Sequence, residues 1–158
     1  MTFYTSEKKS YIGTPEQAEG VHIGENFCKI IVPTGETGNE LGLFGLSLAP
    51  NGPYAKPHFH KEMTELFVVH SGEVLLTRGA EQINAKPGTA LYVPPGIPHG
   101  FANVSDSPAE LLISFTPGRN REKFFYGLAD LLNSKTLPTE EELEKFSELH
   151  DQYRSSYF

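Results

Sequence analysis

The chain has 158 residues, a length that fits one domain and leaves little room for a second. Its formal net charge of −7 counts against nucleic acids and anionic membranes as partners, because both require a basic surface. The single cysteine cannot form an internal disulfide, the N-terminus is charged where a signal peptide is apolar, and prolines and glycines interrupt the longest uncharged stretches. We therefore predict a soluble, cytoplasmic protein without a membrane span.

Turn-forming residues are unusually frequent, with 15 glycines and 12 prolines. This frequency argues against a helical bundle and favours many short strands. Residues 1–20 are polar and weakly patterned, as in an N-terminal arm or a short edge strand. Separated by turn sequences, strands are then expected in this order: 27–32, 41–48, 57–60, 64–70, 73–78, 81–84, 89–93, 99–104 and 109–116. Strands at this spacing predict an all-β sandwich or barrel.

The pattern changes after residue 118. Apolar residues follow one helical face over 120–133, and residues 139–142 form a capping box at the start of a second helix. We expect two short helices packed against the β domain as a lid or brace. Three basic residues at the start of the first helix are expected to face solvent: Arg119, Arg121 and Lys123.

Histidines and one glutamate give the strongest chemical signal. His58 and His60 are separated by one residue, so on a strand their side chains point to the same face. Glu65 can come level with them if the next strand pairs back, and His99 begins a strand after a proline-rich loop. Three neutral imidazoles and one carboxylate suit a divalent first-row metal ion. Two histidines at this spacing are, by themselves, more often surface residues than ligands.

Glycines and prolines frame these residues at fixed spacings. The frame consists of two segments, in chain order Gly52, His58, His60, Glu65 and Gly72, then Gly88, Pro94, Gly96, His99 and Asn103. Both segments resemble the two motifs of the cupin superfamily, and the similarity covers residues 41–116. The resemblance implies a double-stranded β-helix, or jelly-roll barrel, with a metal ion held inside by four ligands: His58, His60, Glu65 and His99.

The resemblance also implies a domain organisation. We expect one cupin domain over residues 1–158, with an all-β jelly-roll barrel at about 20–116 and two short C-terminal α-helices at about 119–154. The metal could be Fe, Mn, Ni, Co, Cu or Zn, because the ligand types admit all six. A cupin that has kept its fold and lost its metal is the alternative. A homodimer is also implied, and an N-terminal edge strand paired across subunits would be one way to form it.

Strand alternation extends the prediction to a substrate pocket. If Glu65 and His99 face inward, the other inward residues of their strands line the same space, which are Phe67, Val69 and Phe101. Weaker candidates for the pocket are Tyr54, Tyr92 and Phe115, although any one aromatic residue is more often ordinary core. No Arg or Lys is expected beside the ligands. We therefore expect an apolar or aromatic small molecule as substrate, and not a phosphorylated sugar.

The segments at 121–130 and 137–143 are similar to the C-terminal part of single-domain, quercetin 2,3-dioxygenase-like cupins. This similarity implies a metal-dependent dioxygenase that cleaves a flavonol-like or other enol-bearing aromatic molecule with O2. Glu65 is then the candidate catalytic residue, as ligand, as the base that takes the substrate's hydroxyl proton, or as both. The alternatives are a non-oxidative metal-dependent cupin enzyme (an isomerase, epimerase or lyase) and a cupin that binds a small molecule without catalysis.

Overall fold

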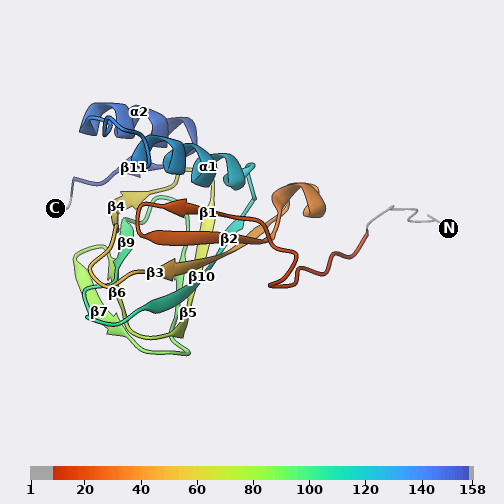
Figure 1. Ribbon diagram of the computed structural model, residues 1–158, viewed down its shortest axis with the longest axis horizontal. Coiled ribbons are helices and arrows are strands. Elements are labelled where there is room, and N and C mark those ends of the chain that lie inside the picture. Colours follow the sequence, from red (N-terminus) through yellow and green to blue (C-terminus); the bar gives the residue numbers. More distant parts are fainter. Residues whose placement is uncertain (1–8, 157–158) are drawn as a thin grey trace.

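Two antiparallel sheets face each other in the computed structural model, which describes residues 9–156 (Figure 1). The six-stranded sheet has the spatial order β1 (Gly20–Ile23), β2 (Asn26–Val32), β3 (Gly42–Leu48), β10 (Ala109–Thr116), β5 (Thr64–Ser71) and β8 (Ala90–Val93). The five-stranded sheet has the order β11 (Tyr153–Arg154), β4 (Ala55–Phe59), β9 (His99–Ala102), β6 (Val74–Arg78) and β7 (Glu81–Ala85). From β3 onward the chain passes from one sheet to the other at every connection between successive strands except that between β6 and β7. This is a jelly roll, and the predicted all-β fold with two C-terminal helices is confirmed.

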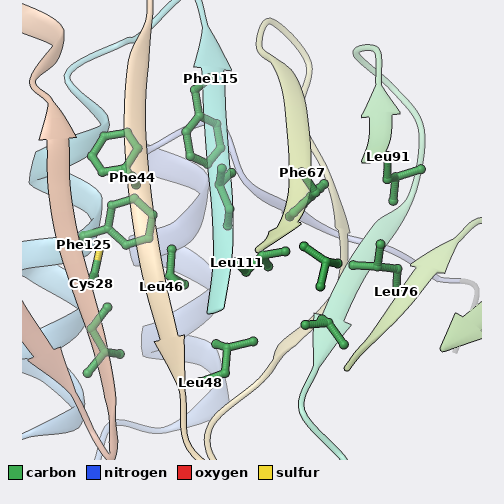
Figure 2. Close-up of a cluster of buried hydrophobic side chains, with 14 of the residues drawn as sticks. Cys28, Phe44, Leu46, Leu48, Phe67, Leu76, Leu91, Leu111, Phe115 and Phe125 are labelled. Carbon is green, nitrogen blue, oxygen red and sulfur yellow. The ribbon is translucent and has the colours of Figure 1, made fainter. Parts of the chain in front are cut away.

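The core lies between the sheets because alternate residues of the central strands are apolar. Burial alternates with a period of two along β3 and β10, as Figure 2 shows for inward side chains such as Leu46, Leu48 and Leu111. The ring centroids of Phe44 and Phe115 lie 5.8 Å apart in an edge-to-face arrangement. Residues of the first helix extend this core beyond the sheets.

The two helices α1 (Arg121–Leu132) and α2 (Glu140–Leu149) lie together on the side of the barrel where β1 and β11 are found (Figure 1). The capping box predicted for the second helix forms, with Thr139 accepting a hydrogen bond from the Glu142 backbone N–H. The rings of Phe124 and Phe146 stack at 5.7 Å and hold the helices against each other. The helices therefore close one side of the space between the sheets.

Each strand expected between residues 27 and 116 is present, with ends shifted by at most a few residues. The structure adds β1, a one-turn 3-10 helix at Thr34–Thr37 and the two-residue strand β11, which the sequence pattern did not indicate as separate elements. Part of the predicted N-terminal arm, residues 1–8, lies outside the described residues. Over residues 9–156 no helix is long and apolar enough to cross a membrane.

Two glycines in left-handed turns give a matched test of the packing between strands. Gly72 has φ +72° in the turn after β5, and a Cβ there would lie 2.6 Å from the carbonyl oxygen of Pro108. Gly79 has φ +56° between β6 and β7, and a Cβ there would meet no atom within 4 Å. We expect Gly79→Ala to lower the free energy of unfolding by about 1 to 2 kcal/mol, the cost of the backbone conformation alone.

Gly72→Ala should lower the free energy of unfolding by at least about 2 kcal/mol more, because the clash with a neighbouring backbone adds to the conformational cost. Urea unfolding of both variants and the parent protein measures the difference. Equal costs for the two variants would contradict the close approach at Gly72.

Candidate metal centre

Four buried residues from both sheets meet at one point inside the barrel. His58 lies in β4 and pairs with His99, the first residue of β9, while His60 comes directly after β4. Glu65 lies in β5 of the opposite sheet. One ligand atom from each residue lies within 4.8 Å of the others, and all four side chains are buried. The structure thus brings together the four residues expected to bind metal.

The strand that carries Glu65 pairs with other strands than the sequence suggested. The expectation was that the strand after His60 would pair back on the histidine strand. Instead β4 pairs with β9 and β11, and β5 pairs with β10 and β8. Residues 60–63 connect the two sheets, with Lys61 and Glu62 exposed at the surface. The carboxylate therefore faces the imidazoles from the opposite side of the barrel.

Backbone carbonyls fix the orientation of all three imidazole rings. The Nδ1 atoms of His58, His60 and His99 lie 2.7, 2.6 and 2.8 Å from the carbonyl oxygens of Lys56, Asp151 and Ile97. Because a carbonyl oxygen can only accept, we assign the proton of each ring to Nδ1. A ring whose only proton is on Nδ1 directs the lone pair of Nε2 into the cluster, as ligation of a metal ion requires.

The charges of the cluster also match a cation. Oε2 of Glu65 lies 2.9 Å from Nε2 of His60 and 2.5 Å from Nε2 of His99. Burial alone would raise the pKa of the Glu65 carboxyl, but His99 and His60 beside it hold that pKa well below its ordinary value. Burial and the neighbouring His99 lower the pKa of His58. One ionised carboxylate among imidazole nitrogens is a donor set that fits a divalent transition metal.

Asp151, which the sequence analysis missed, ties the C-terminal segment to this cluster. It is buried, follows α2 in the left-handed conformation (φ 59°), and its backbone carbonyl accepts the Nδ1 proton of His60. Its carboxylate accepts hydrogen bonds from the backbone N–H groups of residues 61, 62 and 63 at 2.9, 3.0 and 3.1 Å. Asp151 therefore holds the chain between the ligands His60 and Glu65.

A cavity of about 400 Å³ borders the cluster at His58 and Glu65. Its walls come from both sheets and both helices, and most are apolar. Of the residues expected in a substrate pocket, three line this cavity: Tyr54, Phe101 and Phe115. Phe124 and Phe125 of α1 form the helical wall, so this helix encloses the space beside the cluster.

The other three predicted pocket residues do not line the cavity. Phe67 and Val69 face inward as expected, but they belong to the buried core, where the ring of Phe67 lies 5.8 Å from that of His99. Tyr92 points outward and is 64% exposed. The prediction for Tyr92 is wrong because β8 pairs with β5 in unbroken register, which turns Leu91 inward instead.

The position of Arg121 contradicts two further expectations. It was expected to face solvent, and no Arg or Lys was expected beside the ligands, yet Arg121 is buried and lines the same cavity as His58 and Glu65. Its guanidinium lies 3.7 Å from the ring centroid of Phe124. Nη1 donates to the carbonyl oxygen of His150 at 2.9 Å. Lys56 also lines the cavity, where it is exposed and forms an ion pair with Glu140.

A sequence signal for this burial was present. Arg121 precedes Phe124 by three residues, so both side chains occupy one helical face, and that face is the apolar one.

Comparisons with known proteins agree with this architecture. Residues 46–115 match the family described as Cupin domain. An uncharacterised protein of Streptomyces coelicolor is 32% identical over 82 residues, which cover 52% of this chain and 73% of that protein. An uncharacterised protein of Methanocaldococcus jannaschii is 28% identical over 76 residues, which cover 48% of this chain and 61% of the relative's own length, less than two thirds of it.

Among solved structures, that of KdgF from a Halomonas species has a TM-score of 0.62 and 17% sequence identity. The match covers 71% of this chain and 99% of the other, and at this identity it shows the fold alone. The chain belongs to the cupin superfamily. Its buried cluster of three histidines and one glutamate is a possible site for one metal ion, whose identity the donor set leaves open.

Removal of the Asp151 side chain should weaken metal binding without touching a ligand. We expect Asp151→Ala to reduce the affinity for Zn²⁺ or Mn²⁺ by about 10- to 100-fold, because three backbone N–H groups beside His60 and Glu65 lose their acceptor. The measurement is calorimetric titration of each ion into chelator-treated protein. The matched control is Asp130→Ala, an exposed position on α1. Equal affinities in the two variants would show that Asp151 does not support the cluster.

Proposed function

We propose that this protein is a metal-dependent dioxygenase that acts with O2 on an enol-bearing aromatic small molecule. The proposal is carried by one observation: the candidate metal cluster borders the cavity. Two of the four candidate ligands, His58 and Glu65, also line this apolar cavity, which has aromatic side chains in its walls. A ligand in that cavity would meet the cluster directly. The similarity of the C-terminal segments to quercetin 2,3-dioxygenase-like cupins supports the oxidative assignment.

The residues that would hold the ion are His58, His60, Glu65 and His99. A divalent metal bound by them would supply Lewis acidity and, for a redox-active metal, a path for electrons between substrate and O2. The three carbonyl contacts to the Nδ1 atoms keep the imidazoles in one tautomer and orientation. The protein thus contributes a fixed set of donors before any substrate arrives.

Glu65 has one oxygen that can act on the substrate. Both contacts to imidazole nitrogens use Oε2, and Oε1 makes no hydrogen bond within residues 9–156. Since Glu65 also lines the cavity, Oε1 can accept the proton of an acidic hydroxyl group on a bound ligand. The residue therefore combines the roles of ligand and base in this proposal.

Aromatic side chains form part of the cavity wall and would keep water from that part of the space. Phe101, Phe115, Phe124 and Phe125 line the cavity, and the last three are also part of the buried core. A water-poor cavity strengthens electrostatic interactions with a deprotonated substrate and protects a carbanion-like species from proton return. Phe124 and Phe125 come from α1, so the helical segment takes part in forming the cavity and does not only brace the barrel.

A second function is favoured by one observation, the buried cation Arg121 beside the cavity. A guanidinium and a Lewis-acidic ion on two sides of one small molecule also suit a non-oxidative isomerase, epimerase or lyase that acts on an anion. Oxygen dependence separates the two functions.

Oxygen uptake tests the proposal. We expect protein loaded with Fe, Mn, Ni, Co or Cu to consume O2 in proportion to the loss of an enol-bearing aromatic probe, with the flavonol quercetin and the enol-forming acid phenylpyruvate as the first two probes. His99→Ala should reduce the rate by at least about 100-fold, because a donor of the cluster is lost. The control His70→Ala removes an exposed histidine from the outer face of β5 and should leave the rate unchanged.

Two results would contradict the proposal. The first is the absence of O2 uptake with every metal although the metal is bound. The second is substrate conversion that proceeds equally well under nitrogen, which would favour the non-oxidative function.

A further inference from the structure

Arg121 is a buried cation that Glu65 and Asp151 stabilise through space but without a direct ion pair. Its side chain is 3% exposed, and over residues 9–156 no ion pair involves its guanidinium. Two of its donors bond to uncharged acceptors, the carbonyl oxygen of His150 and Oε1 of Gln152. A buried charge without a directly paired counterion costs free energy that the fold must offset elsewhere. Such a charge points to an anion that arrives with a ligand.

The Nε–H group of Arg121 supplies a second, independent observation. In the described part of the chain it is the one buried side-chain nitrogen or oxygen without a hydrogen-bond partner. Buried donors are almost always paired, because a buried donor without an acceptor loses the hydrogen bonds it made to water. Since Arg121 lines the cavity, the missing acceptor can come from a molecule bound there.

Aromatic packing holds the guanidinium in place for such a ligand. Its central carbon lies 3.7 Å from the ring centroid of Phe124 and 4.6 Å from that of Phe115. These contacts and the two hydrogen bonds fix the side chain, so little conformational entropy is lost when an anion binds. Burial lowers the pKa of Arg121 to about 10, which leaves the group charged at neutral pH.

The charge balance of the cavity changes when the cluster holds a metal. Among the charged groups around Arg121, Glu65 stabilises the protonated guanidinium most strongly. A divalent ion bound by Glu65 and three neutral histidines would more than offset that carboxylate. The cavity would then have a net positive cluster at one end and an unpaired guanidinium, and an anionic ligand would stabilise this arrangement.

The chemistry of the walls selects the kind of anion. A guanidinium binds a carboxylate through two parallel N–H donors, whereas a phosphate dianion usually draws on several cations. The other basic side chains of the cavity, Lys56 and Arg154, are exposed and lie next to Glu140. One interior cation among Phe115, Phe124 and Phe125 therefore fits a monoanion with an aromatic or other apolar body.

We propose that the substrate is an aromatic carboxylic acid whose carboxylate is held by the Nε–H edge of Arg121 while its reactive hydroxyl reaches His58 and Glu65. The assignment rests on the proposed function, since it names the substrate class of the same site. Arg121 would be the residue that selects acids over neutral analogues, and a cavity of about 400 Å³ is large enough for a molecule with one aromatic ring.

Binding of a matched pair of probes to Zn²⁺-loaded protein tests the assignment. The probes are 3-phenylpropanoate and 3-phenylpropan-1-ol, which share an aromatic body and differ in the carboxylate. We expect calorimetry to show that the acid binds at least about 10-fold more tightly than the alcohol, the range of one charge-assisted hydrogen bond. Because Zn²⁺ does not change redox state, the result is independent of any oxygen chemistry and of the failure or success of the dioxygenase proposal.

Variants and a direct spectroscopic readout complete the test. Arg121→Met should abolish the preference for the acid, Arg121→Lys should keep part of it, and the control Arg78→Met, which removes an exposed arginine of β6, should keep all of it. Circular dichroism melting reports whether each variant is folded. In the parent protein, the acid and not the alcohol should shift the ¹⁵Nε–H NMR signal of Arg121, a change that a purely structural role would not produce.

Equal affinities for acid and alcohol, the absence of binding by both, or acid binding that leaves the Arg121 signal unchanged would each overturn the assignment. If Arg121→Met does not fold, the NMR signal of the parent protein still decides between the outcomes.

Discussion

The backbone carbonyl of Asp151 accepts the Nδ1 proton of His60 at 2.6 Å, and the arrangement of the whole site depends on this contact. His60 lies at the point where the chain leaves β4 and crosses to the opposite sheet, so no strand pairing fixes it there. The carboxylate of Asp151 satisfies the three backbone N–H groups of that crossing. Because β5 begins directly after the crossing, the position of Glu65 relative to the histidines depends on the same residue.

Arg121 connects this support to the cavity. Its guanidinium bonds to the residues on both sides of Asp151, the carbonyl oxygen of His150 and the side chain of Gln152. The first residue of α1 and the turn after α2 are thus joined at the cavity that His58 and Glu65 also line. The C-terminal helices therefore complete the site in two ways, since they orient one histidine and supply one wall of the cavity. An anion on Arg121 would act on the same contacts that hold Asp151.

Much of the barrel and of the cluster could be predicted from local sequence features. Alternation of apolar residues located the strands, and the His58–His60 spacing within its frame of glycines indicated the metal donors that the structure brings together. Contacts between distant segments could not be predicted in this way. From the sequence, Asp151 looks like an ordinary polar residue after a helix and Arg121 like an exposed charge at a helix start. Their partners lie up to 91 residues away or in other elements. Tyr92, a weaker candidate for the pocket, faces outward because β8 pairs with β5 in regular register. The homodimer stays a prediction.

A crystal structure of the purified protein with anomalous diffraction at the absorption edge of its metal tests the central claim most directly. The result that we predict is one anomalous peak at full occupancy, about 2.0–2.3 Å from Nε2 of His58, His60 and His99 and from a carboxylate oxygen of Glu65. The same map should show the ion open toward the cavity between His58 and Glu65. A protein that retains its fold but has no peak at this position, or an ion bound by other residues, would contradict the assignment of this cluster as a metal centre.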